Sequence, residues 1–386
     1  MNDYIATRYA QFLQDLETVV NIDSASDHLP GLAQVAAFFE RRFSTLGWYV
    51  KTHRFLEGFG PCLQSSNVNP ESFQGQYDVL CLGHIDTVFP EGTAQERPFR
   101  LVNGRAMGPG VADMKAGLTA ALHVAETLEK FGISKKLSVC MAFNSDEEIG
   151  SPASRPWIET LAQRSKRVFV LEPCRATGDY VLQRKGVGFY QILCRGKAAH
   201  AGVEPEKGIN AVVELAHQIL KINSFGNPEK GTTVNVDVAS GGTKTNVIPE
   251  YASAFIDIRV TDPEEIHRIE TLFAELPQQA SMPGVRVEVS GGVNRPPMVP
   301  SPATLKLWDH IAKIGAELGL AMNWIASGGG SDGNFTAALG VPTIDALGPQ
   351  GGRAHSEDEY LELHHITPTV QLLCNVCAAL ADGVIE

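Results

Sequence analysis

Short apolar runs alternate with amphipathic stretches through roughly the first 180 residues of the chain. The runs at 77–83, 136–145 and 167–173 predict strands, and their continuous apolar character predicts a sheet that is covered on both faces. Apolar residues at helical spacing predict helices at 31–47 and 115–132. This alternation of strands and helices is typical of a doubly wound α/β fold.

The pattern changes near residue 185, where helices become fewer and strands follow one another. The predicted elements are a strand at 187–197, a helix at 209–223, strands at 232–241 and 251–260, a helix at 263–276 and a strand at 285–291. This βαββαβ order predicts an inserted ferredoxin-like α+β domain over residues 185–298. A helix at 305–319, a strand at 342–348 and a final helix then complete the first domain, which comprises residues 1–184 and 299–386.

Composition and charge narrow the class of protein. A chain of 386 residues with 44% hydrophobic content favours two globular domains. The net charge of −12 argues against a nucleic-acid or anionic-membrane partner, because both require a basic surface. The N-terminus lacks the pattern of a secretory signal and no apolar run is long enough to span a membrane, so we expect a cytoplasmic protein.

The chain contains seven cysteines, an odd number scattered mostly through apolar stretches, which is typical of reduced core thiols. Cys374 and Cys377 form a C-x-x-C in an apolar helical pattern, and we expect both to pack in the core rather than bind a metal.

Polar residues with metal-binding chemistry follow the predicted strands. His84 and Asp86 come directly after the run at 77–83, at the carboxyl end where open α/β sheets place their sites. In a His-x-Asp pair the carboxylate can accept the second imidazole N–H and thereby fix the metal-binding tautomer. The pair alone is also compatible with an ordinary polar turn.

Further acids occur at equivalent places. Glu147 and Glu148 follow the run at 136–145, and two adjacent carboxylates at a strand end repel each other unless a cation holds them or one serves as an acid/base group. Glu172 lies at the end of the run at 167–173, directly after its apolar residues. Asp113 lies in a glycine-rich turn before a predicted helix, where an aspartate is usually a helix N-cap.

His355 lies in a loop near the C-terminus, flanked by glycines. Together with the strand-end residues it forms a mixed set of imidazole and carboxylate groups suited to zinc, with manganese or cobalt as alternatives. The predicted set is His84, Asp113, Glu148, Glu172 and His355. Five ligands exceed what one tetrahedral ion requires.

The motifs resemble, in order and over nearly the whole chain, those of the M20 metallopeptidases. Within that family the chain resembles the glutamate carboxypeptidases and is close to the acetylornithine deacetylases and aminoacylases. The matching motifs are GHIDTVFP, GPGVADMKAG, DEEIGS, LEP, KAAHAG followed by GINA, TNVIP, SGGGSDGNF and GRAHSEDEY.

The resemblance implies two metal ions bridged by Asp113. One is also held by His84 and Glu172, and the other by Glu148 and His355.

The resemblance also assigns the catalytic roles. Glu147 is the general base that takes a proton from the attacking water and later gives it to the leaving nitrogen. Asp86 is the partner of His84, and the peptide bond between Asp113 and Met114 is expected to be cis.

For substrate binding the resemblance implies residues of the inserted domain, which acts as a lid and pairs two subunits in a homodimer. The implied residues are His200, Asn246, Arg259 and Arg295 of this domain, together with Gly329 outside it. An arginine can grip a carboxylate through two parallel hydrogen bonds. Arg259 also has a purely structural alternative, since it lies on a predicted strand and can pair with Asp257 or Glu250.

These features predict a di-zinc amidohydrolase or carboxypeptidase that acts on a small peptide or N-acyl amino acid. A glutamate-like amino acid is the first expectation for the substrate. An N-acyl amino acid deacylase is the alternative, because carboxypeptidases and deacylases share the metal machinery. A non-catalytic binding protein on the same fold is a remote alternative, since every ligand and the base are present.

Two other activities have weaker support. Ser331, Asp345 and His355 occur in the order of an α/β-hydrolase triad, but that assignment leaves the acids at the strand ends unexplained. The sequence GRAMGPGVADMKAG suggests a phosphate-binding loop, yet it lacks the Gly-Lys-Ser/Thr ending that such loops need.

Overall fold

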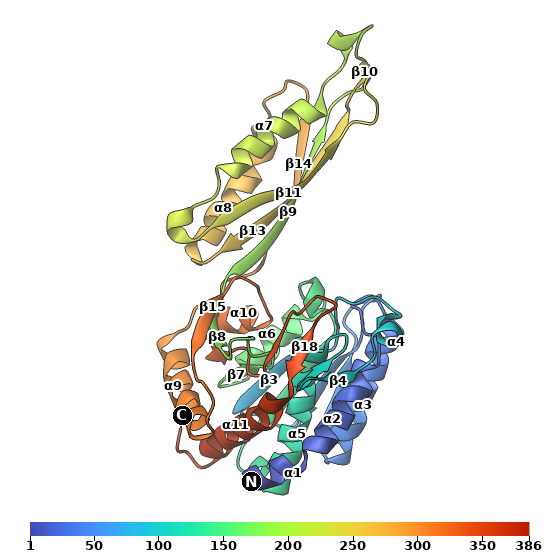
Figure 1. Cartoon of the computed structure of the whole chain (residues 1–386). Coiled ribbons are helices and arrows are strands. Elements are labelled where there is room, and N and C mark those ends of the chain that lie inside the picture. Colours follow the sequence, from blue (N-terminus) through green and yellow to red (C-terminus); the bar gives the residue numbers. More distant parts are fainter. Residues whose placement is uncertain (386) are drawn as a thin grey trace. The chain divides into compact units, whose positions relative to one another are not determined.

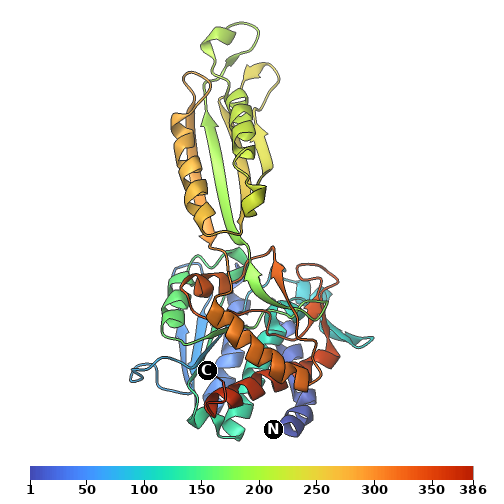
Figure 2. The same ribbon diagram turned by 90° about the vertical axis from the view of Figure 1, so that its left-hand side faces the viewer.

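The computed structural model describes residues 1–385, which form two compact units (Figures 1 and 2). The first unit contains Met1–Gln183, Val299–Ala326 and the chain from Ser331 onward. The second contains Arg184–Met298 together with Ser327–Gly330. The predicted segment 299–386 is therefore interrupted by four residues that belong to the second unit. The catalytic and lid roles assigned to the two segments stay predictions.

The helices of the first unit are α1 (Asn2–Thr7), α2 (Tyr9–Val20), α3 (Leu29–Thr45), α4 (Thr93–Glu96), α5 (Ala116–Lys130), α6 (Arg155–Gln163), α9 (Pro302–Glu317), α10 (Gly333–Ala338) and α11 (Leu363–Ala381). Its strands are β1 (Tyr49–His53), β2 (Cys62–Ser66), β3 (Val79–His84), β4 (Arg100–Val102), β5 (Arg105–Met107), β6 (Val139–Asn144), β7 (Val168–Val170), β8 (Tyr180–Arg184, whose last residue belongs to the second unit), β15 (Trp324–Ser327, likewise), β16 (Thr343–Ile344), β17 (Gly351–Gly352) and β18 (Tyr360–Glu362).

The main sheet of this unit has six strands in the order β1-β2-β6-β3-β7-β16. Strands β6, β3, β7 and β16 run parallel, while β1 and β2 add an antiparallel edge. Along β3, Val79 and Cys81 belong to one hydrophobic cluster and Leu80 and Leu82 to another. Successive side chains of a strand point to opposite faces, so the sheet is covered on both sides, as its apolar strands predict.

Sequence-local signals account for where several helices begin. The Ser301 hydroxyl accepts the backbone N–H of Thr304 at 3.1 Å and caps α9, which starts at Pro302. Proline suits the first helical turn because its missing N–H would have no partner there. The Asn210 side chain likewise caps α7 in the second unit by accepting the N–H groups of Val212 and Val213.

A smaller sheet in the first unit has the order β17-β18-β5-β4. It joins the hairpin before residue 110 to the segment 351–362 near the C-terminus. These two parts of the chain carry Asp113 and His355, respectively, close to their pairing strands.

The second unit contains β9 (Gly186–Arg195), β10 (Ala199–His200), α7 (Ala211–Asn223), β11 (Thr233–Gly241), β12 (Val247–Ile248), β13 (Tyr251–Val260), α8 (Glu264–Glu275) and β14 (Arg286–Arg295). Its antiparallel sheet has the order β11-β13-β9-β14, and the main elements follow one another as β-α-β-β-α-β. A separate core packs residues of α7 and α8 against this sheet, including Leu215, Ile269, Phe273 and Ile192.

The predicted strands at 77–83, 136–145 and 167–173 and the predicted helices at 31–47 and 115–132 are confirmed by β3, β6, β7, α3 and α5. The strand predicted at 342–348 is much shorter and includes only Thr343–Ile344. Beyond it, Ala346 adopts a φ of 61°, which lies outside the extended region and interrupts the strand, although Gly348 still forms an isolated bridge with Pro173.

Cys374 and Cys377 are buried in α11, and all seven cysteines are free thiols in buried surroundings. Core packing of the C-x-x-C is therefore confirmed. Within residues 1–385, no helix combines the length and the apolar character that crossing a bilayer requires.

Candidate metal centre

Three neighbouring parallel strands, β6, β3 and β7, end at the same edge of the main sheet. His84 is the last residue of β3 and is paired in register with Asn144, the last residue of β6. Glu147 and Glu148 begin the short turn that follows β6, and Glu172 lies two residues beyond the end of β7. Because parallel strands share their carboxyl edge, residues distant in sequence meet there.

Asp113 reaches this edge from the turn Val111–Lys115, which leads into α5. The peptide bond between Asp113 and Met114 is cis, as expected. Gly117 allows close packing of the first turn of α5, since a Cβ there would lie 2.0 Å from the carbonyl oxygen of Leu171. The absence of a side chain thus lets the Asp113 turn approach the segment that carries Glu172.

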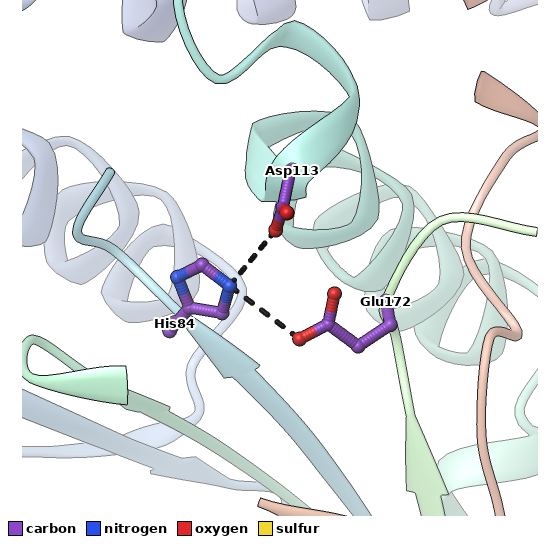
Figure 3. Close-up of side chains that lie close together, drawn as sticks. All are labelled: His84, Asp113 and Glu172. Carbon is purple, nitrogen blue, oxygen red and sulfur yellow. Dashed lines mark hydrogen bonds and ion pairs between the residues drawn. The ribbon is translucent and has the colours of Figure 1, made fainter. Parts of the chain in front are cut away.

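The side chains of His84, Asp113 and Glu172 point toward one another (Figure 3). The Nε2 atom of His84 lies 3.1 Å from Oδ1 of Asp113 and 3.5 Å from Oε1 of Glu172. His84 is buried, with 1% of its side chain exposed, and the two carboxylates are nearly so.

A second group of three side chains shares Asp113 and adds Glu148 and His355. The Nε2 atom of His355 lies 3.3 Å from Oδ2 of Asp113 and 3.2 Å from Oε2 of Glu148. One oxygen of Asp113 therefore faces each group. This use of both oxygens argues against the N-cap alternative for Asp113, and among residues 1–385 no side chain caps α5.

His355 lies in the loop between β17 and β18, where its backbone φ is 63°. A left-handed backbone is uncommon for a residue with a Cβ and is found more often at functional sites. The His355 side chain is 54% exposed, in contrast to the buried His84.

Asp86 is fully buried and contacts both strand ends. Its carboxylate accepts the N–H groups of Glu147 at 3.2 Å and Glu148 at 3.1 Å and the hydroxyl of Ser26 at 2.7 Å. The Nδ1 atom of His84 lies 2.9 Å from the carbonyl oxygen of Asp86 and 3.4 Å from its Oδ1. Asp86 thus holds the turn that carries the two glutamates as well as the ring of His84.

The acids around the two histidines favour protonated imidazole. Hydrogen bonds with Asp113 and Glu148 raise the pKa of His355 to about 11, although burial opposes them. Burial lowers the pKa of His84, but hydrogen bonds with Asp113, Asp86 and Glu172 raise it well above its usual value.

The carboxylates respond in two ways. Burial tends to raise the pKa of Asp113, but its contacts with His355 and His84 hold it well below the usual range. Burial raises the pKa of Glu148 and of Glu172, and the charge of Asp113 adds to both. The site therefore concentrates negative charge in low-dielectric surroundings, which only protons or cations can compensate.

The residues fit a pair of divalent cations. Within the described chain, Oε1 of Glu148 is buried and has no hydrogen-bond partner, so it offers an unused lone pair. In each group the ligand atoms lie within 4.8 Å of one another, and imidazole nitrogen with carboxylate oxygen is a donor set that zinc accepts.

The residues expected to bind substrate belong to the second unit. His200 is exposed on β10, and its Nδ1 accepts the N–H groups of Gly202 and Val203, each at 3.1 Å. The carbonyl oxygen of Asn246 accepts the N–H of Ala201 at 2.9 Å, so two of the predicted residues lie on adjoining segments.

Arg259 forms two hydrogen bonds with Asp257, at 3.0 and 2.9 Å. Its structural alternative is thus realised, and its substrate role stays a prediction. Arg295 is buried in β14, and the carbonyl oxygen of Gly329 accepts a hydrogen bond from Arg184 at 3.2 Å.

The serine-hydrolase alternative is not supported. Ser331 is fully buried and its hydroxyl donates to Oδ2 of Asp345, while His355 contacts Asp113 and Glu148. A nucleophilic serine would need a hydrogen bond to a histidine base and access to substrate.

The phosphate-loop alternative fails for a different reason. The N–H groups of Gly110, Ala112 and Asp113 all donate to the carboxylate of Glu359. Glu359 was not among the predicted site residues. It belongs to the acidic run SEDE, and the sequence alone does not distinguish this buried carboxylate from the exposed acids beside it.

The architecture is a mixed α/β fold with a cluster of potential metal ligands at the strand ends. The model of "Peptidase family M20/M25/M40" matches residues 80–379, and the chain belongs to this family. Its relatives include peptidases and a deacetylase, which is consistent with a hydrolytic enzyme.

Two relatives indicate the range of activities. Carboxypeptidase G2 of Pseudomonas sp. (strain RS-16) is 29% identical over 377 residues, which cover 96% of this chain and 89% of the relative. Acetylornithine deacetylase of Proteus mirabilis (strain HI4320) is 28% identical over 327 residues, covering 79% of this chain and 81% of the relative.

Solved structures with the same fold include a tripeptidase from Staphylococcus aureus, with a TM-score of 0.78 and 22% identity over 97% of this chain and 99% of that structure. An M20 family metallo-carboxypeptidase from Sulfolobus solfataricus has a TM-score of 0.77 and 17% identity, covering 96% and 99%. At these identities the likeness concerns the fold alone.

Proposed function

We propose that this protein is a two-metal amidohydrolase that cleaves the amide bond of a C-terminal or N-acylated amino acid, with zinc as the first choice of metal. The observation that carries the proposal is the arrangement of Asp113, whose two oxygens each face one group of imidazole and carboxylate ligands. A carboxylate in this arrangement is well placed to act as a ligand that bridges two metal ions.

In the proposed centre, His84, Asp113 and Glu172 hold one ion, and Asp113, Glu148 and His355 hold the other. When bound, two such ions lower the pKa of water and polarise the scissile carbonyl group.

Glu147 lies on the turn beside Glu148, and we assign it the role of general base. It takes a proton from the attacking water and passes it to the leaving nitrogen, which lets the amide bond break without expelling an amide anion. Asp86 orients His84 and anchors the turn of Glu147 through the backbone N–H.

We propose that Arg259 and Arg295 bind the substrate carboxylate. Further substrate contacts proposed from the second unit are His200, Asn246 and Gly329. The Arg259 guanidinium is bonded to Asp257, so a substrate carboxylate would have to compete with this partner. We also propose a lid role for this unit, pairing into a homodimer and a cytoplasmic location.

The chain is similar to both a carboxypeptidase and a deacetylase, so two classes of substrate remain. A panel of candidate substrates separates them. The panel should contain dipeptides and folate-like amides ending in glutamate, together with N-acetyl amino acids that include N-acetylornithine. We expect preferred hydrolysis of amides that release a C-terminal glutamate. Preference for N-acetyl substrates would instead favour the deacylase.

The base is tested with Glu147→Ala in the zinc-loaded protein. We expect kcat to fall by about 10²- to 10⁴-fold, the usual contribution of general acid–base catalysis, with about two ions per chain still bound. Glu57→Ala is the matched control, because Glu57 is an exposed glutamate in the loop after β1. Full activity of Glu147→Ala, or failure of the wild type to bind ions, would contradict the proposal.

A further inference from the structure

Glu359 connects the two segments that carry Asp113 and His355. Its side chain is buried, with only 2% of the residue exposed. Oε1 accepts the N–H groups of Ala112 at 2.8 Å and Asp113 at 2.9 Å, and Oε2 accepts the N–H of Gly110 at 3.1 Å. One carboxylate therefore satisfies three backbone donors that lie 246 to 249 residues away in the sequence.

The segment on which Glu359 lies also carries His355, four residues earlier. Glu359 directly precedes β18, which pairs with β17 on one side and with β5 on the other. Strand β5 leads into the turn whose N–H groups Glu359 accepts. The carboxylate and the strand pairing thus hold the same two segments together.

The two segments touch each other closely at Gly351. A Cβ at this residue would lie 2.5 Å from Cβ of Ala112 and 2.8 Å from the carbonyl oxygen of Tyr360. Cβ atoms do not approach this closely in folded proteins, so only glycine permits this separation. The distance between the Asp113 turn and the His355 segment is therefore fixed by packing as well as by hydrogen bonds.

An acid is needed at residue 359 for a geometric reason. Within residues 1–385, its carboxylate oxygens accept hydrogen bonds from the N–H groups of Gly110, Ala112 and Asp113, so the site requires two acceptor oxygens. Glutamine has the same shape but only one acceptor, and its NH₂ group would face a backbone N–H. Loss of one partner leaves a buried donor unsatisfied, which disfavours this arrangement of the turn.

We propose that Glu359 is a positioning residue for the metal centre: it holds the backbone at Asp113 against the segment of His355 and thereby fixes the distance between these two ligands. The proposal rests on the metal centre proposed above. It predicts that loss of this carboxylate weakens metal binding although Glu359 contacts no ion itself, as is common for residues that orient metal ligands.

The experiment compares wild type, Glu359→Gln and Glu362→Gln as full-length proteins. Glu362 is the matched control, because it lies on β18 and pairs with the exposed Arg105, away from the Asp113 turn. Zinc affinity is measured by competition with a chromophoric chelator, and the visible absorption spectrum is recorded after cobalt is added to the metal-free proteins. Circular dichroism of the metal-free proteins monitors folding.

We expect Glu359→Gln to bind zinc about 10- to 100-fold more weakly and to show a changed cobalt spectrum, while Glu362→Gln matches the wild type in both. A spectrum reports the geometry of the ligands and does not change with overall stability alone. Wild-type affinity and spectrum in Glu359→Gln would overturn the proposal.

If Glu359→Gln does not fold, Glu359→Asp decides the question. It keeps the charge but is one methylene shorter, so we expect an intermediate loss of zinc affinity; wild-type affinity would again overturn the proposal. Failure of the underlying metal centre has a different signature, because the wild type itself would then bind neither zinc nor cobalt.

Discussion

Asp86 is a buried carboxylate whose contacts reach two strand ends at once. Its oxygens accept the N–H groups of Glu147 and Glu148, and its Oδ1 lies 3.4 Å from Nδ1 of His84. The sequence motif predicted the contact with His84. Its hydrogen bonds with the Glu147 backbone and with the Ser26 hydroxyl were not predicted, because they join residues about 60 positions apart in the sequence.

We expect Asp86→Ala to weaken zinc binding by about 10- to 100-fold, since it removes a partner of one proposed ligand and frees the turn of another. Each N–H left without a partner in this interior costs about 1–3 kcal/mol of the free energy of unfolding. Zinc competition and urea unfolding measure the two effects. Ser26→Ala is the control: it removes one hydroxyl partner of Asp86, and we expect near-normal zinc affinity.

An Asp86→Ala protein with wild-type zinc affinity would show that Asp86 does not orient the proposed ligands.

Among the elements of the first unit, α2, α3 and α5 are joined by charged side chains that lie apart from the metal centre. Asp15 of α2 accepts a hydrogen bond from Arg42 of α3 and lies 2.9 Å from Nε2 of His123 of α5. Arg42 also pairs with Glu126 of α5. Burial tends to raise the pKa of Asp15, but the hydrogen bonds with His123 and Arg42 bring it below its usual value.

The direction of this shift predicts an acid-sensitive contribution to stability. Because the pKa of Asp15 is lower in the folded than in the unfolded chain, its contribution is complete above about pH 4. The contribution is lost as the pH falls through the folded value. Asp15→Asn should lower the free energy of unfolding at pH 7 by about 3 kcal/mol, the cost of breaking a buried pair.

Urea unfolding over a pH series tests this expectation. We expect the difference in the free energy of unfolding between wild type and Asp15→Asn to become smaller below about pH 4. Asp382→Asn is the matched control, because Asp382 pairs with Lys136 and both side chains are more than half exposed. Such pairs contribute less than about 1 kcal/mol. A gap that stays constant with pH would rule out the ionised form of Asp15 as its source.

On the scale of the whole molecule, the proposed ligands come from five separate segments of the first unit, between His84 and His355. Ions bound by all of them would connect the strand ends, the Asp113 turn and the loop between β17 and β18. Binding that occurs only in the folded state stabilises that state by mass action.

We therefore expect chelation to lower the melting temperature. At an ion concentration 100-fold above Kd, one site stabilises the folded state by about 2.7 kcal/mol. For a domain of this size the shift is on the order of 5 °C. Thermal unfolding with zinc, with a chelator and after zinc is restored measures it. Asp113→Ala, which lacks the shared carboxylate, should melt at the same temperature in all three conditions.

Equal melting temperatures for the wild type with and without chelator would argue against ions that bridge these segments.

The sequence alone predicted several strands of the main sheet and the polar residues at their ends, from local pattern and one rule of sheet topology. Apolar runs located β3, β6 and β7, and polar residues directly after them located His84, Glu147, Glu148 and Glu172. Because parallel strands share a carboxyl edge, the convergence of these residues could be expected from the sequence alone. The motifs in their order also predicted the family, to which the chain belongs.

Only the tertiary structure decided how these groups face one another. The two oxygens of Asp113 point to different ligand groups, Arg259 is paired with Asp257, and Ser331 is buried against Asp345. Glu359 looked like one acid among several in an acidic run. Its contacts span more than 240 residues and depend on the close packing at Gly351, and no local sequence pattern encodes a contact of that range.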